Sequence, residues 1–322
     1  MTDRGSGNYT FTFDDLTFPV EYKYVRGDWS HAEVDDYGND RDNRRVENPI
    51  ALVADTVAFW KESGEVQRAD YLPRIEVISD QFEIPQLIKT RRIAALLPHD
   101  YYENDRRYPV LYLQDGQNLF DDYAPFGSWE VDKKLSLMQQ RGTGDIIVIS
   151  IDHAHEERIA EYNPGGNPRL GKAQGRDYVR FLAETLKPYV DKHFRTKPDR
   201  THTGIGGSSM GGLISIWAGF MYPEVYSKLM IFSPALWVNP NIHFHAMRFT
   251  MTMHSRVYVY AGGAESKNML PNVNRFKNAL LAQDTGEPDL EIELNVDPDG
   301  KHTEAQWGRE FPRAVEWLFF ER

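Results

Sequence analysis

The pattern Gly207-x-Ser209-x-Gly211, which lies between two apolar segments, constrains this chain more than any other feature of its sequence. Residues 202–206 are typical of a strand end, and residues 213–221 are typical of a buried helix that stops before Pro223. A chain that passes so abruptly from strand to helix needs glycines beside the serine, because larger side chains would collide there. The pattern therefore predicts a sharp strand–turn–helix with Ser209 presented at the amino terminus of the helix.

Composition narrows the class of protein. The chain has 322 residues, of which 41% are hydrophobic and 13% aromatic, enough for a packed core. Its formal charge of −11 argues against a nucleic-acid surface, and no apolar segment reaches the roughly 18 residues needed to span a membrane. The absence of cysteine excludes disulfides, thiolate metal sites and cysteine nucleophiles.

The amino terminus bears on localisation. Residues 1–20 carry acidic side chains and no continuous apolar segment, so we expect no signal peptide and a cytoplasmic protein. A secreted precursor trimmed at its amino terminus would show the same features.

Two regions differ in their sequence patterns. Residues 9–13 and 20–25 resemble strands, residues 35–40 a turn, and residues 52–60 a strand or short helix, so residues 1–73 are expected to form a β-rich appendage and linker. From residue 74 to 322, strands and helices alternate, which predicts an α/β fold with a mostly parallel sheet flanked by helices. The strands are expected at 74–78, 92–97, 110–113, 146–151, 257–260 and 290–296, and the helices at 129–140, 175–194, 209–221, 272–282 and 303–320.

A serine nucleophile needs a base and a carboxylate to orient that base. In α/β-hydrolases these follow in the order serine, acid, histidine, each after a strand. Glu265 follows the strand at 257–260 and His302 follows the strand at 290–296, so we predict a triad of Ser209, Glu265 and His302. Asp297 and Asp299 are closer to His302 in sequence, but they come after the strand that normally carries the acid.

An oxyanion hole requires two backbone donors aimed at the tetrahedral intermediate. One should be the N–H of Met210, directly after the serine, and we place the second at Gln117 in the loop after the strand at 110–113. Gly116 would let that backbone approach the substrate. The alternative is an ordinary Asp-Gly turn.

Residues 108–121 closely resemble a segment of the putative-esterase family, which includes esterase D, enterochelin esterases and carbohydrate-esterase feruloyl and acetyl-xylan esterases. The resemblance covers roughly residues 75–320 and implies an α/β-hydrolase fold and hydrolysis of a small, carbohydrate-linked or siderophore-linked ester. The chain departs from the family pattern at Gln114, where histidine is common, and at Glu265, where aspartate is common. Further matching segments are 128–132, 151–152 with Arg158 and 161–162, 207–212, 232–237 and the His302 loop.

The resemblance also suggests substrate-binding residues. It places Arg158, Glu161 and Tyr162 on the leaving-group side. Trp129 and Trp237 could line an acyl or sugar pocket beside Met210. A position in the hydrophobic core is an equally good interpretation for each tryptophan.

Residues 21–29, followed by Asn43-Arg44, resemble the last strands of a starch-binding-type β-sandwich. A whole sandwich takes about 100 residues, so roughly half is present. These strands would be a truncated module, or would pack on the catalytic domain or on a second subunit in a homodimer. Trp29 could serve as a sugar platform, although a core position is commoner for tryptophan.

No cofactor is expected. The pairs His153/His155 and His243/His245 lack a third ligand at zinc-site spacing, so no metal site is predicted. Two other functions remain open: an acyltransferase that uses the same acyl-enzyme, and a non-catalytic glucan-binding protein with a degenerate hydrolase domain.

Overall fold

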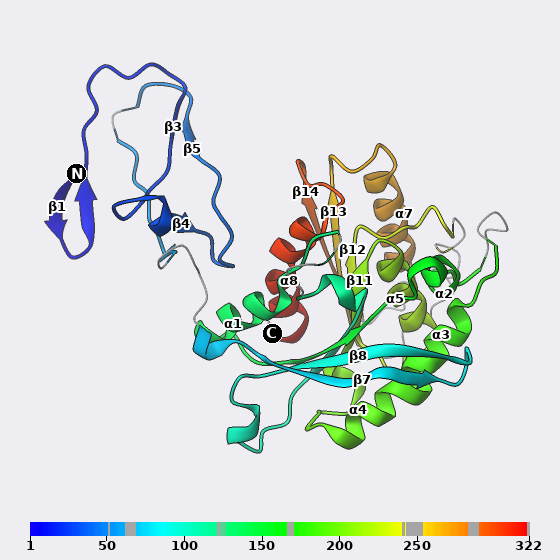
Figure 1. The fold of residues 1–322 in the computed structure, drawn as a ribbon. Coiled ribbons are helices and arrows are strands. Elements are labelled where there is room, and N and C mark those ends of the chain that lie inside the picture. The colour runs from blue at the N-terminus through cyan, green and yellow to red at the C-terminus, as the bar shows by residue number, and fades with distance from the viewer. Residues whose placement is uncertain are drawn as a thin grey trace. The chain divides into compact units, whose positions relative to one another are not determined.

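The computed structural model describes residues 1–50, 52–61, 69–120, 124, 126–165, 171–239, 242, 254–282 and 290–320. Contacts divide the chain into an amino-terminal unit, Met1–Val66, and a carboxyl-terminal unit, Gln67–Arg322 (Figure 1). The boundary predicted between residues 73 and 74 lies slightly further along the chain. None of the described helices is both long enough and apolar enough to cross a membrane.

The amino-terminal unit consists of short antiparallel strand pairs. The pairs are β1 (Thr2–Gly5) with β2 (Asn8–Thr10), β3 (Val20–Tyr22) with β5 (Arg44–Val46), and β4 (Glu33–Val34) with β6 (Phe59–Trp60), and η1 spans Trp29–His31. The strands predicted at 9–13 and 20–25 are thus shorter than expected. Trp29 is 70% exposed, so the expectation of a core tryptophan is wrong.

One buried carboxylate organises this unit. Glu33 is fully buried and accepts hydrogen bonds from the Arg44 guanidinium at 2.7 and 3.2 Å and from the Tyr24 N–H at 3.1 Å. Arg44 also pairs with Asp55 at 2.8 Å, and the hydroxyl groups of Tyr22 and Tyr24 donate to the same aspartate. A charged network therefore ties strands β3, β4 and β5 together where the apolar core is small.

Replacing Arg44 with alanine is expected to destabilise the amino-terminal unit by about 2 kcal/mol, because the buried Glu33 would lose its nearest guanidinium and, among the described residues, keep only the Tyr24 N–H and the more distant Arg41, at 3.9 Å. Backbone hydrogen exchange on the full chain should accelerate across residues 20–60 and stay unchanged in the sheet of the carboxyl-terminal unit. The matched control is Arg45→Ala, since Arg45 bonds only to exposed carboxylates in the part of the chain that the structure describes. Equal exchange in the two variants would contradict the role assigned to Arg44.

The carboxyl-terminal unit is built on an eight-stranded sheet in the order β14-β13-β12-β11-β9-β10-β8-β7. Strands β9 to β14 are parallel, whereas β8 runs antiparallel to β10 and β7 antiparallel to β8. The strands are β7 (Arg74–Ile84), β8 (Lys89–Leu97), β9 (Val110–Gln114), β10 (Ile147–Ile151), β11 (Thr203–Ser208), β12 (Lys228–Phe232), β13 (Ser255–Gly262) and β14 (Leu290–Asp297). The α/β fold with a mostly parallel sheet is therefore confirmed.

Helices cover both faces of this sheet. They are α1 (Val131–Gln140), α2 (Arg158–Glu161), α3 (Gly175–Phe181), α4 (Lys187–His193), α5 (Met210–Met221), α7 (Met269–Leu281) and α8 (Glu304–Phe319). The π-helical segment η7 (Leu182–Leu186) joins α3 and α4, so the helix predicted at 175–194 forms with one irregular turn. Short 3-10 turns are η2 (Ala69–Tyr71), η3 (Tyr101–Glu103), η4 (Gly116–Asn118), η5 (His155–Glu157) and η8 (Arg200–His202).

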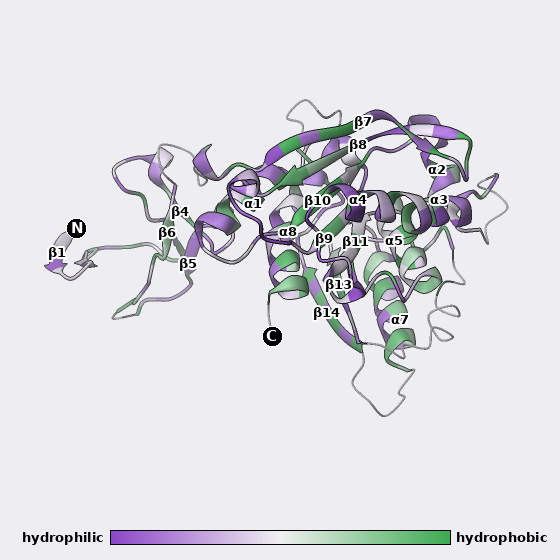
Figure 2. Ribbon diagram, turned by 90° about the horizontal axis from the view of Figure 1, so that it is seen from below, coloured by the Kyte–Doolittle hydropathy of each residue, from purple (hydrophilic) through white to green (hydrophobic). Residues whose placement is uncertain are grey.

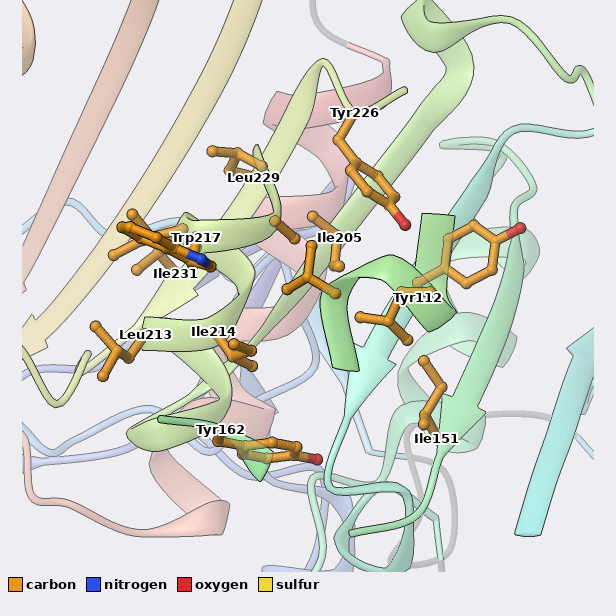
Figure 3. Packing of buried hydrophobic residues seen from close by; sticks show 14 of the residues in the cluster. Tyr112, Ile151, Tyr162, Ile205, Leu213, Ile214, Trp217, Tyr226, Leu229 and Ile231 are labelled. Carbon is orange, nitrogen blue, oxygen red and sulfur yellow. The ribbon is translucent and has the colours of Figure 1, made fainter. Parts of the chain in front are cut away.

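Successive side chains of each strand point to opposite faces of the sheet, so the sheet carries one hydrophobic core on each face. Tyr112, Ile205 and Ile231 point to the face covered by α3, α5 and α7, while Leu113 and Phe232 point to the face covered by α1 and α8. Figure 3 shows the first of these faces, where side chains of β9, β11 and β12 meet those of α5. Helix α5 is hydrophobic in Figure 2, as expected for a helix buried on nearly all sides.

Among the strands of the eight-stranded sheet, β12 is the one that the sequence did not predict. Its five residues follow closely on α5 and include only four apolar side chains, too few to distinguish a strand from a loop. The strand matters because it lies between β11 and β13 and carries Ser233 at its carboxyl end. Six parallel strands thus deliver their following loops to one edge of the sheet, where the predicted site residues lie.

Candidate active site

Ser209 occupies the turn between β11 and α5. Its φ of 54° and ψ of −117° are strained for a residue with a side chain. The backbone is held there by the Ser209 N–H, which donates to the Phe232 carbonyl at 2.9 Å, and by the Ser209 carbonyl, which accepts from the Ala235 N–H at 2.9 Å. The neighbouring strand β12 therefore fixes the conformation that presents the serine.

The two motif glycines allow the strand and helix to meet closely. A Cβ at Gly207 would lie 2.9 Å from the backbone of Gly211, and one at Gly211 would lie 2.9 Å from an Asp115 carboxylate oxygen. Neither glycine has a positive φ, so they serve close packing, and within the motif Ser209 alone has a strained backbone. This matches the collision argument made from the sequence.

Glu265 and His302 meet in the loops after β13 and β14. His302 Nδ1 lies 2.6 Å from Glu265 Oε2. The other carboxylate oxygen, Oε1, accepts from the Ser233 hydroxyl at 2.5 Å and from the Gly262 N–H at 2.7 Å. The acid is therefore held on both oxygens, with one of them directed at the imidazole.

The electrostatics of this pair favour an ionised acid. The Glu265 side chain is 2% exposed and that of His302 is 40% exposed. Burial alone would raise the pKa of Glu265, but the hydrogen bonds from His302, Ser233 and Gly262 outweigh burial and hold this pKa below its ordinary value. A charged carboxylate thus faces a partly exposed imidazole.

Two other loop acids are engaged elsewhere. Asp297 Oδ2 accepts from the Gln306 amide at 2.5 Å, and its Oδ1 accepts from the Asp299 N–H at 3.0 Å. The imidazole contacts Glu265 instead. Glu265 is therefore the better-placed partner for His302.

Contacts through β12 connect Ser209 to this pair. The Phe232 carbonyl accepts from the Ser209 N–H, and the next residue, Ser233, donates to Glu265, which contacts His302. These strand ends are level with one another, since Ser208 pairs with Phe232 and Phe232 with Tyr260. All three predicted catalytic residues lie at the same edge of the sheet.

The loop after β9 carries the second predicted oxyanion donor. The Gln117 side chain exchanges two hydrogen bonds with the His153 backbone, at 2.9 and 3.0 Å, which fixes this loop to the one after β10. Met210 opens α5, so its N–H has no acceptor within the helix, and no described group accepts the N–H of Gln117. A Cβ at Gly116 would lie 2.5 Å from Ser150 and Asp152, so packing alone requires glycine there.

Asp115 anchors the same loop in a left-handed conformation, with φ of 59°. The Arg158 guanidinium donates to both of its oxygens, at 2.6 and 2.7 Å, and lies over the Tyr162 ring at 5.1 Å. Burial would lower the pKa of Arg158, but the bonds to Asp115 outweigh it and raise this pKa. The guanidinium is therefore committed to holding the loop.

Comparison with known proteins identifies the family. The family model described as "Putative esterase" matches residues 85–318. The chain belongs to this family.

Relatives of this esterase include proteins of several names. The chain is 23% identical to "Uncharacterized protein YbbA" of Bacillus subtilis, over 71% of this chain and 92% of the relative. It is 26% identical to "Endo-1,4-beta-xylanase/feruloyl esterase" of Xylanibacter ruminicola, over 53% of this chain but 20% of that much longer relative.

Solved structures share the fold. The esterase resembles the BES protein from Bacillus cereus, with a TM-score of 0.61 and 16% identity over 85% of this chain and all of that one. It also resembles the enterobactin esterase FES from Shigella flexneri, with a TM-score of 0.59 and 17% identity over 78% of this chain and 60% of that one.

Two of the predicted substrate-binding residues of this esterase are fully buried. Glu161 bonds to Lys89 at 3.0 Å and Arg91 at 2.6 Å, and the Tyr162 hydroxyl accepts weakly from the Asp115 N–H at 3.4 Å. Direct substrate contact by Glu161 and Tyr162 is therefore contradicted. Tyr162 contacts the loop that carries Asp115, whereas Glu161 ties α2 to strand β8 through Lys89 and Arg91.

Gln114 and Trp129 are also internal. The Gln114 side chain is buried beneath Gly207 and Gly211 and accepts a hydrogen bond from the Tyr178 hydroxyl at 2.6 Å. The glutamine that stands where histidine is common in the family therefore packs under the serine turn. Trp129 is 2% exposed and stacks on Phe232, with ring centroids 5.3 Å apart. For Trp129, the structure supports the core alternative.

Trp237, in contrast, is 63% exposed. It follows two residues after Ala235, whose N–H bonds to the Ser209 carbonyl. An exposed indole so close in the chain to the serine turn keeps Trp237 a candidate for substrate contact.

The sequence missed Ser233 and Trp307. The Trp307 indole N–H donates to the Ser233 hydroxyl at 2.9 Å, and its ring packs edge-on against His302. A serine directly after a strand and a tryptophan five residues after the predicted base were the available signals. Both signals are weak, because neither residue belongs to a catalytic motif, and their contacts with Glu265 and His302 show their place in the site.

The histidine pairs add little to the site. The rings of His153 and His155 are neighbours, and His153 Nδ1 accepts from the His155 N–H at 2.9 Å. Within the described ranges, no group of three or more His, Asp or Glu side chains is arranged to hold a metal. His243 and His245 lie outside the described residues.

Proposed function

We propose that this esterase is a serine carboxylic-ester hydrolase that works through an acyl-enzyme. The observation that carries the proposal is the 2.6 Å contact between His302 and an almost fully buried Glu265, at the same sheet edge as a backbone-strained Ser209. A buried carboxylate on Nδ1 leaves Nε2 of the imidazole to accept the serine proton.

The reaction would proceed in two steps. His302 takes the proton from Ser209 as its oxygen attacks the ester carbonyl, and the N–H groups of Met210 and Gln117 stabilise the oxyanion. The C–O bond to the alcohol breaks as His302 protonates the departing oxygen. Water then attacks the acyl-enzyme with His302 as base, and release of the carboxylic acid restores Ser209. No step requires a cofactor.

The family and the exposed indole of Trp237 support a proposal for the substrate class. Similar structures include an enterobactin esterase in the presence of 2,3-di-hydroxy-N-benzoyl-glycine and a feruloyl esterase module complexed with sinapinate, and both of these ligands are aromatic. Trp237 offers an exposed aromatic face on which an aromatic acyl group or a sugar ring could stack. We therefore propose a small ester or one linked to a carbohydrate or siderophore.

A fluorophosphonate probe tests the mechanism directly. The probe should label the wild-type protein, peptide mass spectrometry should place the label on Ser209, and Ser209→Ala should abolish it. Ser208→Ala is the matched control, since Ser208 is a neighbouring, buried serine of the same motif. Labelling that follows Ser208, or no labelling of a protein that hydrolyses p-nitrophenyl esters, would reject the proposal.

A further inference from the structure

Ser233 combines backbone strain with burial. It follows β12, its φ is 44°, and its side chain is inaccessible to solvent. Its N–H donates to the Tyr260 carbonyl at 2.8 Å, which fixes the turn. Glycine would adopt this conformation without strain, so the presence of serine indicates that the hydroxyl has a use.

The hydroxyl has two partners of opposite character. The Trp307 Nε1–H, which can only donate, lies 2.9 Å from Ser233 Oγ. A Glu265 carboxylate oxygen, which can only accept when ionised, lies 2.5 Å from the same Oγ. The indole therefore directs the hydroxyl proton toward the carboxylate, and the bond becomes charge-assisted.

Trp307 contacts the other member of the pair as well. Its ring lies 4.8 Å from the His302 ring, centroid to centroid, at an interplanar angle of 86°. The residue stands in the first turn of α8, whose amino terminus is capped by the Thr303 side chain. One rigid indole thus fixes the hydroxyl that binds Glu265 and restricts the rotation of the imidazole.

We propose that Ser233 and Trp307 are positioning residues that hold Glu265 and His302 in the arrangement needed for proton transfer. The proposal rests on the function proposed above. Neither residue exchanges a proton with substrate. Together they determine which carboxylate oxygen faces the imidazole and where the imidazole lies.

The test compares Ser233→Gly, Ser233→Ala and Trp307→Phe with two matched controls. Ser233→Gly relaxes the strained backbone, so it should fold even if alanine does not. Ser227→Ala removes a buried hydroxyl at the other end of β12, and Trp317→Phe removes an indole further along α8. In p-nitrophenyl ester hydrolysis, kcat should fall about tenfold in the three variants with little change in KM, and both controls should keep the wild-type kcat.

A spectroscopic measurement separates positioning from general stability. The short hydrogen bond between His302 Nδ1 and Glu265 should give a strongly deshielded proton resonance in the wild type. This resonance should shift or broaden in Ser233→Gly and Trp307→Phe and remain in both controls. Unchanged kcat and an unchanged resonance would overturn the proposal, and so would a fall in kcat with the resonance intact.

The resonance needs no turnover, so it also separates the two proposals. If Ser209→Ala keeps full activity, the proposed function fails. A perturbed resonance in Ser233→Gly would still show that Ser233 positions the pair.

Discussion

Replacing Ser209 with alanine is expected to lower kcat for ester hydrolysis by about 10⁵-fold, because the acyl-enzyme has no other nucleophile at the proposed site. Residual turnover should come from the oxyanion donors and from substrate binding alone. The fold should persist, since the contacts that hold the turn use the backbone of Ser209 and not its hydroxyl. The measurement is steady-state kinetics with p-nitrophenyl acetate, together with a thermal melt of each protein.

Two companion variants sharpen this result. Ser208→Ala should retain activity, because its side chain is buried at the end of β11. Ser209→Gly should be as inactive as Ser209→Ala but more stable by about 1 kcal/mol, since glycine relieves the positive φ. Turnover within tenfold of wild type in either Ser209 variant would show that another nucleophile operates.

The sequence predicted the site best where catalytic chemistry imposes an order on the chain. A serine turn, an acid after one strand and a histidine after the next are each constrained by the fold, so the order of residues alone favours Glu265 over Asp297. The contact at 2.6 Å between Glu265 and His302 agrees with that preference.

Burial decided the cases in which sequence reasoning failed. Glu161 and Tyr162 are polar residues at the carboxyl end of α2, and both are buried: Glu161 pairs with Lys89 of β8, and the Tyr162 hydroxyl contacts Asp115. Trp129 and Trp237 could not be told apart from the sequence, and the structure buries one and exposes the other. Such outcomes depend on tertiary packing, which no local pattern reports.

Strand β12 and Ser233 show a related limit. The five-residue strand has no distinct periodicity, so its position between β11 and β13 was not predicted. The role of Ser233 depends on that position, because only there does its hydroxyl lie between Trp307 and Glu265.

Replacing Glu265 with glutamine is expected to lower kcat by about 10⁴-fold at neutral pH. The Ser233 hydroxyl and the Gly262 N–H would keep the amide oxygen on their side, so the amide nitrogen would face His302. An amide N–H donates to Nδ1 of His302 and so favours the imidazole tautomer that carries its proton on Nε2. A protonated Nε2 cannot accept the proton of Ser209. Steady-state kinetics at neutral pH measures the loss. The control is Glu310→Gln, which replaces a partly buried carboxylate on α8 and should keep a kcat close to that of the wild type.

The pH dependence of stability gives this prediction a second, independent measurement. Because hydrogen bonding holds the pKa of Glu265 below its ordinary value, the ionised carboxylate stabilises the folded protein above its unfolded-state pKa. This stabilisation is lost as the pH falls through the lowered pKa. The difference in unfolding free energy between wild type and Glu265→Gln should therefore shrink in acid, and a difference that stays constant from neutral pH into strong acid would contradict an ionised Glu265.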